Sequence, residues 1–332
     1  MYEKYYNLSG IPFQLTPDSR FFFGSSGHSR AIAHLVYGLA QEEGFIVITG
    51  EVGAGKTTLV EQLWSQLDRN SYVMSRIVTT RVSGDDLLRL AVAGFGVPDD
   101  GGSDKATLLR RFERMACDQR AAGRRCLLVV DEVQNLPMAA LEELRMLSNI
   151  TVDGRASVQT ILLGQPQFRS TMANPDLEQL RQRILASYHL GPLTEAETRA
   201  YVEHRLNRVG WKGDPAWQDA AFTYLFKYTN GIPRRINTLC SRVLLYGAIE
   251  ETHSITGPMV EITASELNQD LGAGLAAPQA AVEMSGPASV DTPPSPGRDN
   301  LLRRVEALEA TTAKQDRVFR RVLELLSVVA DR

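Results

Sequence analysis

Hydrophobic positions between residues 45 and 190 follow two alternating patterns. Short runs of consecutive apolar residues predict buried strands, and the longer stretches between them repeat apolar residues at helical spacing. We predict strands at 45–49, 72–78, 126–130, 158–163 and 184–190, and helices at 55–67, 84–95, 104–122, 137–148, 165–173 and 176–182. Strands that alternate with helices in this way predict an α/β fold with a parallel sheet between two helical layers.

The pattern changes near residue 192, where strand-like runs disappear. Helical spacing continues at 194–209, 215–229 and 233–249, with a shorter stretch at 264–271. Thr194 and Glu197 have the spacing of a capping box, and Asn230-Gly231 ends one helix before Pro233 opens the next. We therefore predict a leader at 1–43 that packs on the core, an α/β core domain at 44–191 and an α-helical lid domain at 192–271.

The last part of the chain divides in two by composition. Residues 272–299 are rich in Ala, Gly, Pro and Ser and lack aromatic residues, which predicts a disordered linker. Residues 300–332 space apolar residues alternately four and three apart, with Arg and Glu beside them. This spacing predicts a coiled-coil or partner-binding helix, and the alternative is one amphipathic helix folded back on the body.

Composition and charge narrow the location and the partners. The net charge of -3 gives no overall electrostatic reason to expect nucleic acid or an anionic membrane as the main partner. No stretch reaches the roughly 20 apolar residues that a membrane span requires, and the first residues lack the apolar run of a signal peptide. We therefore expect a cytoplasmic protein with no direct membrane span.

Residues 50–57, Gly-Glu-Val-Gly-Ala-Gly-Lys-Thr, fit the pattern G-x-x-x-x-G-K-[ST] between a predicted strand and a predicted helix. Backbone N–H groups can turn inward around a triphosphate where the turn is rich in glycine. We expect ATP to bind here, with Lys56 on the β- and γ-phosphates and the Thr57 hydroxyl on Mg²⁺. The predicted nucleotide-binding residues of this loop are Gly50, Gly53, Ala54, Gly55, Lys56, Thr57 and Thr58.

A second predicted strand, at 126–130, ends in two adjacent carboxylates, Asp131 and Glu132. Asp131 can organise Mg²⁺, and Glu132 can polarise the attacking water as the catalytic base. The alternative is that both residues only cap the following turn. Together with the glycine-rich loop, the pair predicts hydrolysis of ATP to ADP and phosphate.

Several longer motifs resemble one family. They are "YNLSGIPFQLTPDSRFFFGSSGHSRAIAHLVYGL", "GFIVITGEVGAGKTTL", "VVDEVQNLPMAALEELRMLSNI", "LLGQPQF", "LRQRI" and "NGIPRRIN". Together they resemble the AAA+ ATPases of the general secretion pathway A (ExeA-like) family, and within it the branch associated with the exosortase (PEP-CTERM) system. The resemblance implies a P-loop AAA+ core with a five-stranded parallel sheet and an α-helical lid.

The resemblance also implies roles for four further residues. Gln165 falls at the sensor 1 position, beside the γ-phosphate and the attacking water. Arg183 matches the arginine finger, with Arg181 as the second candidate, and Arg234 matches sensor 2 in the lid. For each arginine the alternative is a surface charge or a structural ion pair. An arginine finger acts on a neighbouring subunit, which implies a ring or spiral homo-oligomer, commonly a hexamer.

Two biological roles follow from the resemblance. In the first, the ATPase powers or regulates an envelope export or exopolysaccharide system, and the C-terminal helix binds a protein partner that holds it at the inner membrane. In the second, it is a transposition-type regulator, similar to TniB or Mu B, that forms ATP-dependent filaments on duplex DNA. An arginine run at 110–125 keeps DNA as a candidate partner, although such a run is usually a solvated face.

Aromatic residues gather near the start of the chain and allow two interpretations. They could line the adenine pocket, or they could fasten the leader to the body. They are Tyr5, Tyr6, Phe13 and residues 21–23, with His28 and Arg30 nearby.

Overall fold

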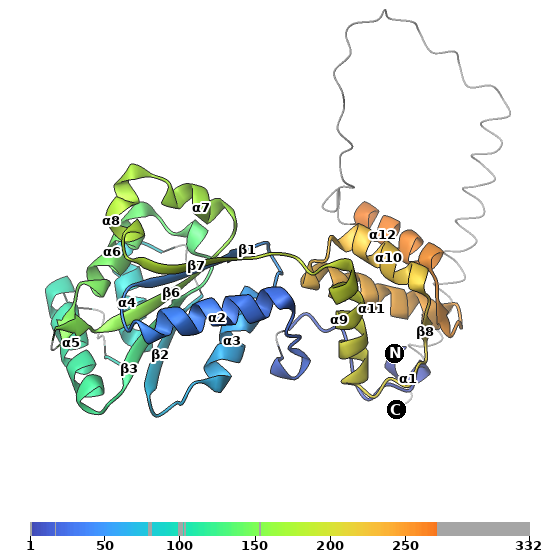
Figure 1. The fold of residues 1–332 in the computed structure, drawn as a ribbon, viewed down its shortest axis with the longest axis horizontal. Helices are drawn as coiled ribbons and strands as arrows, with labels where there is room; N and C mark the ends of the chain where they lie inside the picture. The colour runs from blue at the N-terminus through green and yellow to red at the C-terminus, as the bar shows by residue number, and fades with distance from the viewer. Residues whose placement is uncertain are drawn as a thin grey trace, which may run out of the picture.

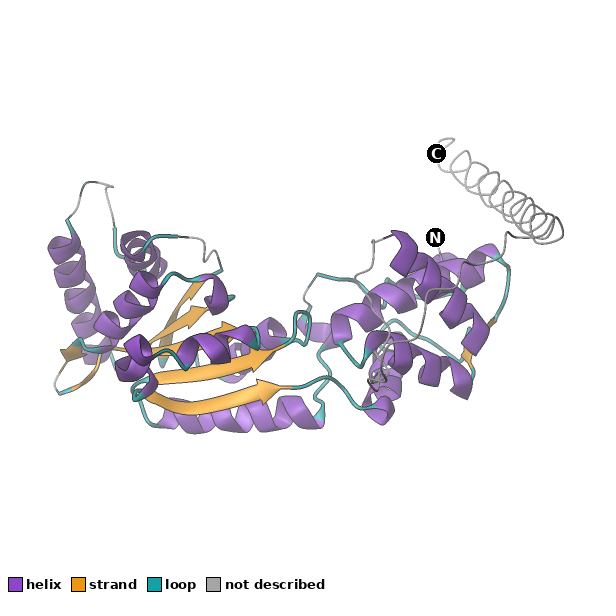
Figure 2. Ribbon diagram, turned by 90° about the horizontal axis from the view of Figure 1, so that it is seen from above, coloured by secondary structure: helices purple, strands orange, loops and turns teal. Residues whose placement is uncertain are grey.

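The computed structural model describes residues 2–270, apart from Pro17, residues 79–81 and 99–101, Ser103 and Asp153. The linker predicted at 272–299 and the helix predicted at 300–332 lie outside the described residues and stay predictions. Figure 1 shows an α/β part and a helical part side by side. Figure 2 shows the long strands, in orange, in the first of them.

A five-stranded parallel sheet forms the core of the first part, in the order β2-β3-β6-β1-β7. The strands are β1 (Phe45–Gly50), β2 (Tyr72–Ile77), β3 (Arg125–Val130), β6 (Val158–Gly164) and β7 (Ile184–Leu190). All residues of β1 and β6 are buried, which explains why these strands read as continuous apolar runs. The five predicted strands are confirmed within one residue at each end, and so is the α/β fold class.

Helices cover both faces of the sheet. Ile46 and Ile48 of β1 face one layer, while Phe45 and Val47 face the other, because successive side chains of a strand point to opposite sides. The first layer is α2 (Ser26–Ala40) and α3 (Lys56–Gln66); the second is α4 (Gly84–Gly94), α5 (Lys105–Ala121), α6 (Met138–Ser148), α7 (Gln167–Met172) and α8 (Glu178–Arg181).

Four short elements complete the core, and the sequence patterns missed most of them. A hairpin of β4 (Thr151–Val152) and β5 (Arg155–Ala156) precedes β6. Two single-turn 3-10 helices lie at η2 (Val133–Asn135) and η3 (Pro175–Leu177). Together η3 and α8 make up the short helix that was predicted at 176–182.

The helical domain contains α9 (Glu195–Asn207), α10 (Asp219–Thr229), α11 (Pro233–Ile249) and α12 (Gly257–Asp270). The predicted capping box at the start of α9 is confirmed. The second helix begins later than predicted, because β8 (Ala216–Trp217) pairs with β9 (Ser254–Ile255), and the last helix begins earlier. No helix among the described residues is long and apolar enough to cross a membrane.

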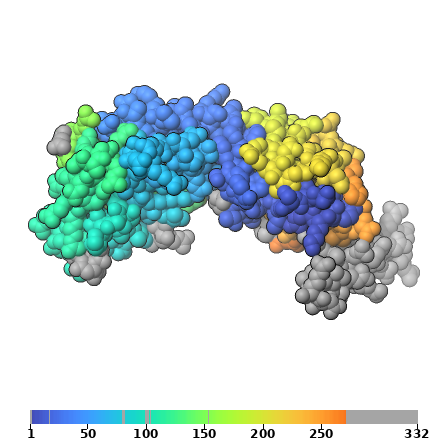
Figure 3. Space-filling view, turned by 90° about the horizontal axis from the view of Figure 1, so that it is seen from below, coloured from blue at the N-terminus to red at the C-terminus, as the bar shows by residue number. Residues whose placement is uncertain are grey.

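The leader packs differently from our expectation. Only α2 packs on the sheet, whereas the residues before it join the hydrophobic cluster of the helical domain. Figure 3 shows these first residues, in dark blue, against that domain. The buried residues that they contribute are Tyr2, Tyr6, Leu8, Phe13 and Phe21, and the short helices among them are α1 (Tyr2–Tyr5) and η1 (Ser19–Phe21).

A buried charge explains why the leader stays with the helical domain. Arg205 of α9 is 6% exposed; its Nε donates a hydrogen bond to the Pro12 carbonyl at 2.6 Å, and its guanidinium lies over the Phe21 ring. An arginine buried this deeply is destabilising unless its donors are used, so the leader backbone completes the packing of α9.

Replacing Phe13 with alanine tests this packing. The ring is 2% exposed in the helical cluster, so Phe13→Ala should lower the free energy of unfolding by about 3–5 kcal/mol in urea denaturation. Ile11→Ala is the matched control, since Ile11 is 48% exposed, and it should change stability by less than about 0.5 kcal/mol. Equal effects of the two changes would contradict the packing of the leader.

Candidate nucleotide site

The loop between β1 and α3 is shaped by two glycines. Gly53 and Gly55 have φ angles of +83° and +99°, a region that other residues rarely adopt. The helix begins directly at Lys56, whose Nζ donates hydrogen bonds to the carbonyl oxygens of Gly50 at 2.8 Å and Glu51 at 3.1 Å. An ammonium group therefore lies at the positive end of α3, which is an arrangement suited to an anion.

Lys56 is almost fully buried, with 5% of its surface exposed. Burial lowers the pKa of its ammonium, and the nearby carboxylates of Glu132 and Asp131 act in the opposite direction. A buried cation that is held mainly by loop carbonyls can exchange those partners for the oxygens of an anionic ligand. This fits the predicted contact with phosphate.

Thr57 and Asp131 meet across the site. The Thr57 hydroxyl donates a hydrogen bond to Asp131 Oδ2 at 2.8 Å, and Asp131 itself is 4% exposed at the end of β3. Arg76 of β2 lies 3.5 Å from the same oxygen. A hydroxyl and a carboxylate beside a phosphate loop are hard oxygen ligands of the kind that Mg²⁺ prefers, since it is usually held by few protein groups and by the phosphates. The residues therefore fit a magnesium-nucleotide complex.

Glu132 follows Asp131 in a left-handed backbone conformation, with φ of +52°. Burial raises the pKa of its carboxyl group. Hydrogen bonds from Gln165 and Gln134 and the charges of Lys56 and Arg234 outweigh burial, so the pKa lies below its usual range. The carboxylate is thus ionised near neutral pH, which is the state that can accept a proton or a hydrogen bond from water.

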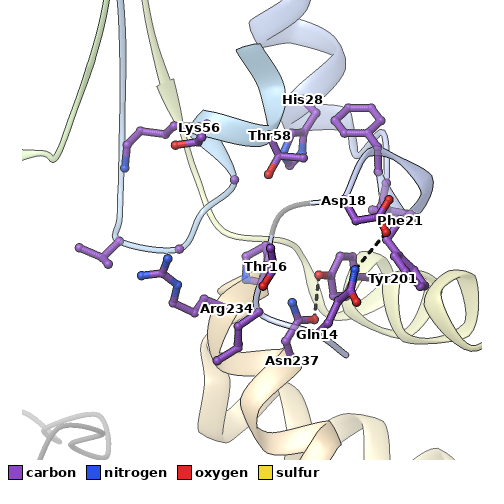
Figure 4. A pocket seen from close by; sticks show the side chains of 18 of the residues that line it. Gln14, Thr16, Asp18, Phe21, His28, Lys56, Thr58, Tyr201, Arg234 and Asn237 are labelled. Carbon is purple, nitrogen blue, oxygen red and sulfur yellow. Dashed lines mark hydrogen bonds between the residues drawn. The ribbon is translucent and has the colours of Figure 1, made fainter. Parts of the chain in front are cut away.

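A pocket of about 340 Å³ lies between the core and the helical domain and collects residues from three parts of the chain. Figure 4 shows Lys56 and Thr58 on one side and Arg234 and Asn237 on the other. The backbone N–H of Arg234 donates to the Gly53 carbonyl at 3.2 Å, so the first turn of α11 rests on the loop itself. The predicted residues that line the pocket are Gly53, Gly55, Lys56, Thr57, Thr58, Asp131, Glu132 and Arg234.

Two predicted residues of the loop, Gly50 and Ala54, are absent from this lining, and so is Gln165. The Gly50 carbonyl accepts a hydrogen bond from Lys56, and Ala54 is buried in the hydrophobic cluster beneath α2 and α3. Gln165 does not line the pocket either, but its Nε2 donates to Glu132 Oε2 at 3.0 Å. Gln165 therefore reaches the site through the glutamate.

The leader aromatics divide between the wall of the pocket and the helical cluster, and Phe21 belongs to both; a contact with adenine stays a prediction. Phe21, Phe22 and Phe23 line the pocket, and Phe21 is also buried in the helical cluster. Tyr6 and Phe13 lie in that cluster and not among the residues that line the pocket. The leader thus supplies both a wall of the pocket and an anchor.

Of the other lining residues, the sequence analysis named His28 but missed Tyr201, Arg205 and Asn237. Tyr201 donates from its hydroxyl to Asn237 Oδ1 at 2.9 Å and accepts from Arg205 Nη1 at 2.8 Å, so α9 and α11 are joined at the pocket wall. His28 of α2 lies beside the loop, and burial lowers the pKa of its ring. In the sequence, the only indication of these hydrogen bonds is that Tyr201 and Arg205 are four residues apart on one predicted helix and can therefore contact each other.

The two candidate arginine fingers lie outside the pocket. Arg183 donates to the carbonyl and the hydroxyl of Ser148, both at 3.2 Å, and it precedes β7. The loop follows β1, which is parallel to β7, so Arg183 lies at the opposite edge of the sheet, on the order of 20 Å away. Arg181 donates to the Met172 carbonyl at 3.1 Å and pairs with Glu178. Their role as fingers stays a prediction.

The fold is a P-loop fold of the AAA+ class. It is defined by the strand order of the parallel sheet, the phosphate loop after β1, the two carboxylates after β3 and the helical domain over the loop. Residues 39–172 match the family model of the AAA domain. Over 271 residues the chain is 35% identical to General secretion pathway protein A of Aeromonas hydrophila. This match covers 81% of the chain and 49% of the relative, so the chain spans about half the length of that protein.

Solved structures agree on the fold. The ORC2 protein of Aeropyrum pernix in its ADPNP-ADP complexes is 18% identical with a TM-score of 0.58, over 79% of this chain and 71% of that one. The ORC1 protein of Aeropyrum pernix in complex with DNA is 16% identical with a TM-score of 0.54, over 74% and 66%. At these identities the likeness concerns the fold alone. An AAA+ fold with this loop implies nucleotide binding.

Removing the Lys56 ammonium tests the phosphate contact. Lys56→Ala should weaken ATP binding by at least about a hundredfold, because a buried charge-assisted contact to the phosphates is lost. Titration with a fluorescent ATP analogue measures this. Lys212→Ala, on an exposed lysine of the helical domain, is the control and should bind normally. Tight binding by Lys56→Ala would overturn the assignment of the loop.

Proposed function

We propose that this chain binds ATP with Mg²⁺ between its core and its helical domain and hydrolyses it to ADP and phosphate. The observation that carries the proposal is one pocket in which Lys56, the Thr57–Asp131 pair and an ionised Glu132 come together. The chemistry of phosphoryl transfer needs mainly positioning and charge stabilisation, and these side chains supply both.

Each residue has a role in this proposal. Lys56 binds the β- and γ-phosphates, and Arg234 approaches them from the first turn of α11. The Thr57 hydroxyl and the Asp131 carboxylate hold Mg²⁺, which neutralises phosphate charge when it is bound. Glu132 orients and polarises the attacking water, and Gln165 holds the Glu132 carboxylate by hydrogen bonding.

We propose that the active form is a ring or spiral of identical subunits, with Arg183 acting on the nucleotide of a neighbour. The position of Arg183 at the far edge of the sheet supports this, because it cannot reach the pocket of its own chain. Its bonds to Ser148 would hold it in place as part of a rigid core surface.

The similarity to General secretion pathway protein A supports a role in export. We propose that hydrolysis powers or regulates an envelope export or exopolysaccharide system of the exosortase-associated type, with the helix predicted at 300–332 binding a protein partner. The motifs that resemble the exosortase branch, in the leader and around the loop, support this narrower assignment.

Duplex DNA is the alternative partner. The similar ORC1 structure contains DNA, but its likeness concerns the fold alone. Two arginines of the run at 110–125, Arg120 and Arg125, form ion pairs with Glu42 at 3.8 and 3.4 Å. These pairs make the two side chains less available to the phosphates of DNA. Filaments of the Glu132→Gln variant that form only on duplex DNA at near-physiological salt would favour this alternative over the export role.

Replacing the proposed base separates binding from hydrolysis. Glu132→Gln should bind ATP normally and hydrolyse it at least about a hundredfold more slowly, the scale of a lost general base. Phosphate release and titration with a fluorescent ATP analogue measure the two properties. Glu142→Gln, on an exposed residue of α6, should hydrolyse at the normal rate. Near-normal turnover of Glu132→Gln would remove it from this role.

Mixing two inactive variants tests the finger. Subunits with Arg183→Ala keep a complete pocket, and subunits with Lys56→Ala keep the arginine, so a mixed oligomer contains some complete sites. We expect each variant alone to be inactive and the mixture to regain a measurable part of the wild-type hydrolysis rate. Failure at every mixing ratio, with mixed oligomers shown by size-exclusion chromatography, would contradict action between subunits.

A further inference from the structure

Gln134 bridges two loops at the edge of the sheet where the pocket lies. It is the middle residue of η2, two positions after Glu132. Its Nε2 donates a hydrogen bond to Glu132 Oε2 at 2.6 Å, and its Oε1 accepts from the backbone N–H of Gln165 at 2.9 Å. One amide thus joins the end of β3 to the end of β6.

The chemistry of its partners allows only one orientation of this amide. An ionised carboxylate can only accept hydrogen bonds, so the NH₂ group must face Glu132. A backbone N–H can only donate, so the carbonyl oxygen must face Gln165. A flipped amide would lose both bonds, and the orientation is therefore determined by the two neighbours and not by a choice between equivalent atoms.

The side chain of Gln165 closes the arrangement. Its Nε2 donates at 3.0 Å to the same Glu132 oxygen that Gln134 binds. Three hydrogen bonds therefore connect Glu132, Gln134 and Gln165 in a triangle. Since β3 and β6 are neighbours in the sheet, the triangle spans two adjacent strand ends.

The surrounding packing leaves the triangle little freedom. A Cβ on Gly164 would lie 2.9 Å from Val133 Cγ2 and 3.1 Å from Phe168 Cβ, so the turn after β6 rests closely on η2. Glu132 keeps a left-handed backbone, which persists only where the neighbouring structure holds it. Gln134 itself is half-buried and does not line the pocket, so it can affect a ligand only through Glu132.

We propose that Gln134 is a positioning residue that holds the Glu132 carboxylate in the orientation needed for hydrolysis and links it to the sensor 1 position, Gln165. This inference rests on the proposed ATP hydrolysis. A misplaced catalytic group can lower the rate strongly without changing substrate affinity, because correct orientation contributes to the reaction step.

Two substitutions in the full chain separate this role from packing. Gln134→Ala should lower kcat by at least about tenfold and leave the dissociation constant for ATP within about threefold. Gln134→Glu keeps the shape but replaces the donor by a second carboxylate facing Glu132. We expect it to lower kcat at least as much as alanine does. Gln66→Ala, on an exposed glutamine of α3, is the matched control and should behave as wild type.

The measurements are steady-state phosphate release with Mg²⁺, titration with a fluorescent ATP analogue and thermal unfolding. A milder effect of Gln134→Glu than of Gln134→Ala would indicate packing and overturn the inference, and so would loss of ATP binding in both variants. If the wild type hydrolyses ATP and both variants hydrolyse it at the same rate, the inference is overturned and the proposed function stands. A wild-type chain that binds ATP without hydrolysing it would overturn the proposed function and this inference with it.

Discussion

The parallel pairing of β3, β6 and β1 is the constraint on which the site depends. Parallel strands end at the same edge of a sheet, so the phosphate loop after β1, the carboxylates after β3 and Gln165 after β6 become neighbours although they are far apart in the sequence. The bond between Thr57 and Asp131 joins the first two, and the triangle around Glu132 joins the last two. A shift of β3 in register would move Asp131 and Glu132 together and break both connections.

The helical domain packs closely against the phosphate loop, where Gly53 meets Arg234. A Cβ on Gly53 would lie 2.3 Å from the Cβ of Arg234, and the Gly53 carbonyl accepts the backbone N–H of Arg234. The loop that is shaped for phosphates and the first turn of α11 are therefore in direct contact. The leader in turn is fixed to α9 through Arg205, so the loop, the helical domain and the leader form one connected set of contacts.

The sequence predicts the parts of the fold that depend on local pattern and misses those that depend on a distant partner. Strands β1 and β6 are buried on both faces, so their apolar runs stand out, and the spacing of Gly, Lys and Thr in the loop is set by the ligand itself. The leader gives no such signal. Its aromatic residues predict that the leader is buried, but they do not indicate which domain buries it. The role of Gln134 is equally hidden, since its two partners come from different strand ends.

The charges around the pocket set the conditions under which the proposed arginine finger would act. Among the described residues, the cations that line the pocket are Lys56, Arg76, Arg205 and Arg234, and the carboxylates of Asp131 and Glu132 lie in the same lining. Arg76 is already 3.5 Å from Asp131, and Arg205 is held by the leader backbone. An arginine added to these cations would stabilise the charge that develops on a transferred phosphoryl group. An arginine fixed on the far edge of the sheet, as Arg183 is, can serve that purpose only in an assembly of several chains.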